Sequence, residues 1–242
     1  MPVIVSSFAA DFRAAFDVLL TPRATFRRFG SRNPIVAPWL TFSVLSIVLT
    51  LLTLSVMQRA SAHLLAGSEA EELRAATEAS LARMKLASTV GAPVAVLMRW
   101  CFVALALWAP AALAGSTATY RTFLSVAAYS TMPDILEKAL DLGVTWFSGP
   151  EVSNELVPQL TASTSIAALL PDVSGNEWVV AALANTTLFS LWGLVLWTVG
   201  VRVRGRLDRA PAIAVAGSAW CFFLVVGSAS DVLQASLAGA LG

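Results

Sequence analysis

The sequence has few charged residues. Asp, Glu, Lys and Arg make up 13% of its 242 residues, which is about half the share that soluble domains carry. Hydrophobic residues make up 57% of the chain and the formal net charge is only +1, so no bulk basic field would attract nucleic acid. This composition predicts an integral membrane protein whose first partner is the lipid bilayer.

Cysteine and histidine are also scarce. The two cysteines, Cys101 and Cys221, lie in apolar runs, which argues against a disulfide framework and favours two small buried hydrophobic side chains. With His63 as its one histidine, the chain has no Cys/His cluster for a metal, and a Ser-His-acid triad could form only around that position. GVRVRGR lacks the lysine and serine of a phosphate-binding loop, and no dinucleotide fingerprint is present. We therefore expect a non-catalytic protein with no metal and no cofactor.

Long apolar runs dominate what the sequence does contain. Crossing about 30 Å of hydrocarbon takes roughly 20 helical residues at about 1.5 Å each. The pattern predicts an all-α polytopic membrane protein, with a cytoplasmic amphipathic and basic segment at 1–34 and a five-span membrane domain at 35–242. The expected spans are residues 35–57, 91–114, 122–147, 179–203 and 211–228.

Lysine and arginine set the expected orientation, because they concentrate in cytoplasmic connections. With the N-terminus inside, most of the 16 basic residues fall on the cytoplasmic side. They are Arg13, Arg23, Arg27, Arg28, Arg32, Arg121, Arg202, Arg204, Arg206 and Arg209. The C-terminus is then extracytoplasmic. Six of these arginines are expected at the interface, facing lipid headgroups: Arg23, Arg27, Arg28, Arg202, Arg204 and Arg206.

The N-terminal segment has the pattern of an amphipathic helix. Phe8, Phe12 and Phe16 recur at helical spacing, and Thr21-Pro22 then opens a second short helix. Two interpretations are open. The phenylalanines lie on the anionic cytoplasmic leaflet as an interfacial helix, or they cap the cytoplasmic end of the bundle.

Two further stretches lie between the expected spans. Ser68 and Glu71 form a capping box before an amphipathic helix that would extend the first or the second span beyond the membrane. Such a helix docks a partner or folds back on its own protein. Residues 165–171 are too short to cross and are expected to be interfacial or re-entrant.

The third expected span contains a proline and four charges. Pro133 should kink the helix just before Asp134, Glu137, Lys138 and Asp141. At about 100° per residue, the four charges fall within roughly 100° of arc, so they share one face. That face must turn toward the bundle interior or water. Asp134 and Lys138, at i and i+4 with the acid leading, favour a local ion pair.

Arg99 in the second span is the expected partner of the remaining acids. Measured from the outer span ends at Gly91 and Phe147, Arg99 is about 12 Å deep, while Glu137 and Asp141 are about 15 and 9 Å deep. The sequence therefore predicts a pair of Arg99 with Glu137 or Asp141. The leftover carboxylate would be protonated, reach water, or hold a cation or another subunit's base. The network has three candidate roles: fixing helix register, carrying a proton or substrate, and contacting a subunit.

Four stretches resemble the landmarks of one family. They are LLTPRATF (19–26), NPIVAPWL (33–40), YRTFLSVAAYSTMP (120–133) and LFSLWGLVLWTVGVRVRGRLDRAPA (188–212). In order and spacing they are similar to those of the Yip (Ypt-interacting protein) domain family, in its prokaryotic form. The resemblance implies a five-span integral membrane protein with an N-terminal cytosolic segment.

The resemblance also implies partners. Eukaryotic relatives take part in vesicle traffic and bind Rab-type GTPases through a longer cytosolic region with a DLYGP-like motif, which is missing here, so GTPase binding is not expected. Some prokaryotic relatives accompany transporter complexes. We therefore expect protein partners in a prokaryotic inner or plasma membrane.

Two functional hypotheses follow. The first is a non-catalytic scaffold or accessory subunit of a membrane transport or trafficking complex. The alternative is a small permease or lipid-handling protein that uses the charged third span. Transporters usually contain internal repeats or paired broken helices. The sequence indicates one broken helix and no repeat, which favours the scaffold.

Overall fold

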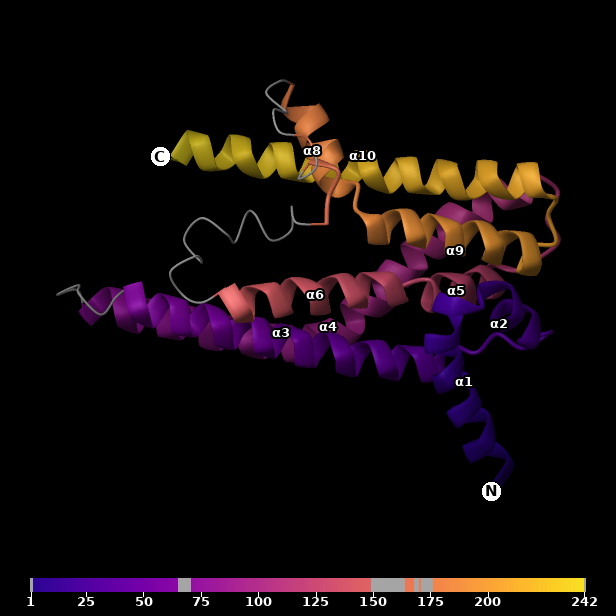
Figure 1. The fold of residues 1–242 in the computed structure, drawn as a ribbon, viewed down its shortest axis with the longest axis horizontal. Helices are drawn as coiled ribbons and strands as arrows, with labels where there is room; N and C mark the ends of the chain where they lie inside the picture. The colour runs from indigo at the N-terminus through magenta and orange to yellow at the C-terminus, as the bar shows by residue number, and fades with distance from the viewer. Residues whose placement is uncertain (1, 65–70, 149–163, 168–169, 171–175, 242) are drawn as a thin grey trace.

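Long helices run lengthwise through the molecule (Figure 1). They are α3 (Val36–Leu64), α4 (Glu71–Leu113), α6 (Met132–Ser148), α9 (Leu188–Arg204) and α10 (Arg209–Leu241). The computed structural model describes residues 2–64, 71–148, 164–167, 170 and 176–241. Over these residues the chain is helical, with no β-strand. The prediction of an all-α protein is confirmed.

The two ends of the bundle differ. α1 (Pro2–Leu20) and α2 (Pro22–Arg28) lie at the end where α9 turns into α10, and α1 runs steeply away from the bundle axis (Figure 1). We call this end the basic end, because Arg27, Arg121 and Arg206 are exposed there. The C-terminus lies at the opposite end (Figure 1).

Among the residues that the structure describes, three helices are long and apolar enough to cross a membrane. They contain the stretches Val36–Val56 in α3, Ala79–Leu113 in α4 and Arg209–Leu237 in α10. These match the first, second and fifth expected spans. α4 is much longer than its expected span, since it is one helix of 43 residues from Glu71. The amphipathic stretch therefore extends the second span, as one of the two alternatives predicted, while Ser68 lies outside the described residues.

The third expected span is two helices. α5 (Tyr120–Tyr129) ends before Ser130, and α6 begins at Met132. Pro133 stands in the first turn of α6, where its missing N–H leaves no bond unmade. At the end of α5, the Thr131 hydroxyl donates to the Ala127 carbonyl at 2.9 Å and so satisfies a group that the break would otherwise leave free. The expected kink is therefore a complete break.

The prediction of one helix over 179–203 is wrong. α8 (Glu177–Asn185) packs across α10, and α9 starts afresh after Thr187 (Figure 1). The Thr187 hydroxyl accepts a hydrogen bond from the Ser190 amide at 3.0 Å, and the Ser190 hydroxyl accepts one from the Thr187 amide at 3.0 Å. This capping box starts a new helix inside the apolar run.

A short segment, residues 164–167, lies against this second break. Ser165 forms an isolated antiparallel bridge with Thr187. The Ile166 amide donates to the Thr186 carbonyl at 2.9 Å, and the Leu188 amide donates to the Thr164 carbonyl at 3.2 Å. Non-helical backbone inside a membrane protein needs such internal partners. The described part of the short 165–171 stretch thus packs against the protein's own helix break.

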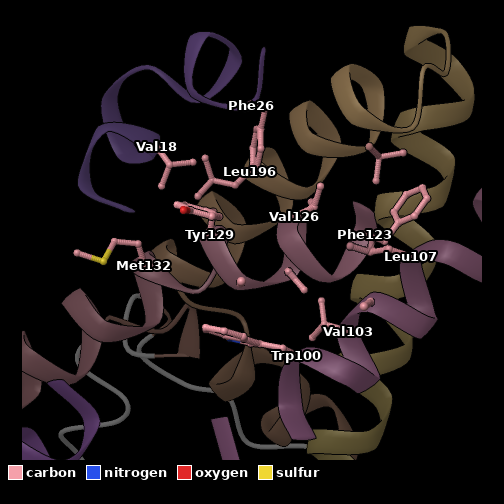
Figure 2. Packing of buried hydrophobic residues seen from close by; sticks show 14 of the residues in the cluster. Val18, Phe26, Trp100, Val103, Leu107, Phe123, Val126, Tyr129, Met132 and Leu196 are labelled. Carbon is pink, nitrogen blue, oxygen red and sulfur yellow. The ribbon is translucent and has the colours of Figure 1, made fainter. Parts of the chain in front are cut away.

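Buried hydrophobic side chains of several helices pack together in the core (Figure 2). Phe26, Val126, Tyr129 and Leu196, from α2, α5 and α9, are fully buried. Each such side chain contributes roughly 1.5–3 kcal/mol through burial. A β-carbon at Gly200 would collide with Val126 and press on the Phe26 ring, so α9 approaches α5 closely because glycine stands there.

The N-terminal phenylalanines divide into two groups. Three on α1 are 42%, 45% and 42% exposed: Phe8, Phe12 and Phe16. α1 instead buries Ala14 and Ala15 against the bundle, while Phe26 and Phe29 are 0% and 2% exposed. The phenylalanines of α2 and the residue after it therefore cap the bundle, and the capping interpretation is wrong for those of α1.

Both cysteines are free thiols. Cys101 is half-buried, whereas Cys221 on α10 is exposed, so the expected burial is wrong for Cys221. Its neighbours Phe222, Val225 and Val226 are also exposed. This flank of α10 is an apolar surface suited to lipid.

Candidate functional site

An ion pair joins α4 to α6. Arg99 Nη2 lies 2.5 Å from Asp134 Oδ2, and the two side chains are 52% and 22% exposed. The prediction that Arg99 pairs with Glu137 or Asp141 is therefore wrong. A tight turn connects α4 to α5, so residues equally far from it lie opposite each other. Arg99 lies 14 residues before Leu113, and Asp134 lies 14 residues after Tyr120.

The other charges of α6 have separate environments. Because Asp134 pairs across helices, the predicted local pair with Lys138 is not formed, and Lys138 is exposed. Glu137 is half-buried and accepts a hydrogen bond from the Thr164 hydroxyl at 3.2 Å. Asp141 is also half-buried. The structure thus joins Asp134 to Arg99 and Glu137 to the segment that lies against the second break, instead of making one network.

A cavity of about 300 Å³ lies beside the ion pair, at the meeting point of the two helix breaks. Arg99, Asp134 and Ser130 line one side of it, and Asn185 and Ser190 come from the second break. Trp197, Trp220 and Phe223 supply an aromatic wall. Sequence reasoning missed the second break. The run Asn185-Thr186-Thr187 could have indicated it, because three residues that favour helix caps and turns interrupt an apolar stretch there.

Ser130 is the least satisfied polar group around this cavity. It is 3% exposed, and its hydroxyl has no hydrogen-bond partner among the described residues. Its neighbour Thr131 accepts from Trp100 Nε1 at 2.9 Å, which ties the break to α4. A buried hydroxyl without a partner is costly and calls for an explanation.

Arg204 lies in a different environment, at the basic end. It is 9% exposed. Its guanidinium donates to the carbonyl of Gly30, to the carbonyl of Arg32 at 2.7 Å and to Asn33 Oδ1 at 2.7 Å. The group also lies 5.9 Å from the centre of the Phe29 ring. The expectation that Arg204 faces lipid is therefore wrong, because it ties α9 to the α2–α3 connection.

The other arginines expected at the interface are exposed: Arg23, Arg27, Arg28, Arg202 and Arg206. Arg28 pairs with Asp17 of α1 at 3.1 Å. Arg27 and Arg206 border a polar depression of about 530 Å³, together with Thr119 and Thr122 of the α4–α5 region. This end of the bundle therefore presents cationic side chains around a hollow.

Polar contacts also fix α1. Arg32 lies 3.8 Å from Asp11, and Tyr129 donates to the Asp11 carbonyl at 3.2 Å. Burial raises the pKa of Asp11 above its ordinary value, while the charge of Arg32 partly offsets this shift. These contacts of Asp11 tie α1 to the bundle, and the Asp11 carboxyl group titrates in mild acid.

The apolar helices, three of them long enough to cross a membrane, define a helical membrane protein. The model of the Yip1 domain matches residues 16–230, which is most of the chain. The protein therefore belongs to the Yip1 domain family, and the resemblance drawn from its sequence is confirmed. No curated protein and no solved structure matches the chain.

Proposed function

We propose that this protein is a non-catalytic scaffold or accessory subunit of a membrane transport or trafficking complex. Membership of the Yip1 family supports a membrane-associated, trafficking-related role. The proposed organisation has a cytoplasmic segment at 1–34 and a membrane domain at 35–242, in a prokaryotic inner or plasma membrane. Its partners are the bilayer and other membrane proteins.

The membrane domain crosses five times in this proposal. α3, α4 and α10 supply three spans. α9, with 17 residues, covers about 25 Å at 1.5 Å per residue, and α5 with α6 forms the remaining broken span. The basic end faces the cytoplasm because arginines favour that side. The N-terminus is then cytoplasmic and the C-terminus extracytoplasmic.

α1 acts as an interfacial helix in this arrangement. It runs steeply across the bundle axis, as a helix lying in the membrane surface would (Figure 1). Phe8, Phe12 and Phe16 are exposed and would enter the headgroup region. Arg23 and Arg27, also exposed, would meet anionic lipid.

The observation that carries the scaffold role is the length of α4. About 20 residues counted back from Leu113 cross the hydrocarbon, so residues 71–92 extend beyond it. This extension presents Leu86 and Val90, which share one helix face at i and i+4 and are 69% and 68% exposed. An apolar helix face beyond the membrane fits a membrane-protein partner that has its own helix on the extracytoplasmic side.

Purification of the full chain in mild detergent, followed by mass spectrometry, tests this role. We expect the same integral membrane protein to co-purify in fixed ratio. Leu86→Gln with Val90→Gln should release it, while the control Met84→Gln with Ser88→Gln, an i, i+4 pair on the other side of the same helix, should retain it. Recovery of the chain alone from native membranes, or retention by both double variants, would contradict the proposal.

A second candidate is a small permease or lipid-handling protein. The observation that favours it is the cavity of about 300 Å³ between two broken helices, beside the Arg99–Asp134 pair. Paired broken helices form the substrate sites of many transporters. Movement of a labelled lipid or solute in vesicles containing the purified protein tests this candidate, and rates equal to those of protein-free vesicles would contradict it.

A further inference from the structure

The groups around the cavity have hydrogen-bonding capacity that the protein leaves unused. Among the described residues, the Arg99 guanidinium bonds to Asp134 through Nη2, although it carries five N–H donors. The Arg99 side chain is 52% exposed, and the Asp134 side chain is 22% exposed. Ser130, which lines the same space, has an unpartnered buried hydroxyl. Two of these groups, Arg99 and Asp134, are therefore open enough to contact one bound molecule.

The charges in the cavity restrict what this molecule can be. A simple anion would approach Arg99 but meet the carboxylate of Asp134, and a simple cation would meet the opposite conflict. A molecule that carries both charges can place its anion at Arg99 and its cation at Asp134. Only such a ligand finds a favourable partner for each of its charges.

The aromatic wall favours the same ligand. The faces of tryptophan and phenylalanine attract ammonium groups, and Trp197, Trp220 and Phe223 line the cavity. Its volume of about 300 Å³ lies at the lower limit for small-molecule sites. The space therefore suits a compact polar group rather than a whole lipid.

We propose that this cavity binds a zwitterion whose phosphate or carboxylate contacts Arg99 and whose ammonium group lies against Asp134 and the tryptophans. The source is either the headgroup of a zwitterionic phospholipid, with its acyl chains in the bilayer, or a free zwitterionic solute. The inference rests on the second candidate function, whose cavity it fills, and is independent of the scaffold role.

Binding to the full-length, detergent-solubilised protein tests the inference, by native mass spectrometry and by thermal stabilisation. The probes are phosphatidylethanolamine, soluble glycerophosphoethanolamine, anionic phosphatidylglycerol and inorganic phosphate. We expect the first, the second or both to bind in preference to the last two. Binding of the lipid alone identifies a headgroup site within the bilayer, and equal binding of the soluble compound identifies a solute site.

Variants locate the site. Arg99→Gln and Asp134→Asn should each weaken zwitterion binding by about tenfold or more, since each removes a charge-assisted contact. Gly193 lines the cavity and has open space where a β-carbon would stand, so Gly193→Leu should abolish binding while both charges remain. Gly217→Leu, at a helical glycine with open space that does not line the cavity, is the matched control and should bind as the wild type does.

Three results would overturn the inference: undiminished binding by Gly193→Leu, equal binding of phosphatidylglycerol or phosphate, or no binding of either zwitterion. If a charge variant fails to fold, the comparison of Gly193→Leu with Gly217→Leu still tests whether the zwitterion binds in the cavity. Transport is measured separately on the same preparations. Specific binding without transport would sink the permease role and leave the site standing, and neither result depends on the co-purifying partner.

Discussion

Two arginines of this protein have opposite environments. Arg204, at the basic end, is 9% exposed and gives its hydrogen bonds to neutral oxygens of residues 30–33. Arg99, beside the cavity, has a side chain that is 52% exposed and one acidic partner. The first guanidinium gives three hydrogen bonds to the protein's own oxygens, although its Nε has no partner among the described residues, and the second is open to an added molecule. Enclosure indicates a structural role and openness indicates binding.

The surroundings of the two arginines reinforce this difference. On one side of Arg204, Phe26 and Phe29 are buried and Gly200 leaves no room for a β-carbon, while Arg204 also borders the open polar depression at the basic end. Around Arg99 the protein leaves a cavity and an unsatisfied hydroxyl at Ser130. Well-packed interiors contain few voids larger than a water molecule. The residues around the cavity, Arg99, Ser130 and Asp134, which we call the loose layer, are therefore less tightly packed than Phe26, Phe29 and Gly200, which we call the dense end. We expect stability to reside in the dense end and binding in the loose layer, and variants of each region test this.

The largest effect is expected at Phe26. Phe26→Ala should lower the free energy of unfolding by about 3–5 kcal/mol, because it leaves a hole in the buried core. Unfolding of the purified protein by sodium dodecyl sulfate or heat measures this. The control Phe12→Ala removes the same atoms from an exposed site and should change stability by less than about 0.5 kcal/mol. If Phe26→Ala and Phe12→Ala lost the same unfolding free energy, the buried and the exposed phenylalanine would contribute equally to stability, contrary to this prediction.

The next effect is expected at Arg204. Arg204→Leu should cost about 3 kcal/mol of unfolding free energy, since three hydrogen bonds, each worth roughly 1 kcal/mol, are lost. Arg202→Leu, two residues away and exposed, should cost less than about 0.5 kcal/mol. If Arg204→Leu were equally harmless, Arg204 would belong with the interfacial arginines after all.

A smaller stability effect is expected in the loose layer. Arg99→Gln and Asp134→Asn should each change the unfolding free energy by about 1 kcal/mol or less, because exposed ion pairs contribute little. The double variant measures the coupling between the two side chains in the same unfolding assay. A loss as large as that of Arg204→Leu would show that the pair is structural and would remove the contrast between the two arginines.

The smallest effect concerns Asp11. Burial raises its pKa, with Arg32 offsetting part of the shift. A raised pKa in the folded state means that the stability contribution is complete below the ordinary value of about 3.9 and is lost as pH rises through the raised value. Asp11→Asn should therefore flatten the stability profile over that mildly acidic window, as measured by thermal unfolding against pH. The exposed Asp208→Asn is the control, and an unchanged slope in Asp11→Asn would contradict the assignment.

Several elements could be predicted from the sequence because their causes are local. The apolar runs at 35–57, 91–114 and 211–228 predicted helices that the structure contains within α3, α4 and α10. Pro133 predicted an interruption before the charges of α6, and the chain breaks two residues earlier. Asn185 to Thr187 carried a comparable local signal for the second break, which the surrounding hydrophobicity obscured.

The candidate site depended on long-range geometry. Counting helix depth from Gly91 pairs Arg99 with Glu137 or Asp141, but α4 continues to Glu71, so Gly91 is not the outer end of the helix. The closed turn between α4 and α5 fixes the register, and it selects Asp134. Arg204 gives a second example. A basic run near a membrane predicts exposed arginines, but residues 30–33 fold over α9 and bury Arg204.

The sequence by itself determined that this chain is helical, apolar and interrupted at Pro133, because helix formation and membrane affinity follow from composition and from residues within a few turns of each other. The tertiary structure alone decided which acid meets Arg99, which arginine is enclosed and where two helix breaks leave a cavity. These outcomes depend on where distant segments stop and meet, and no local pattern encodes the depth at which one helix faces another.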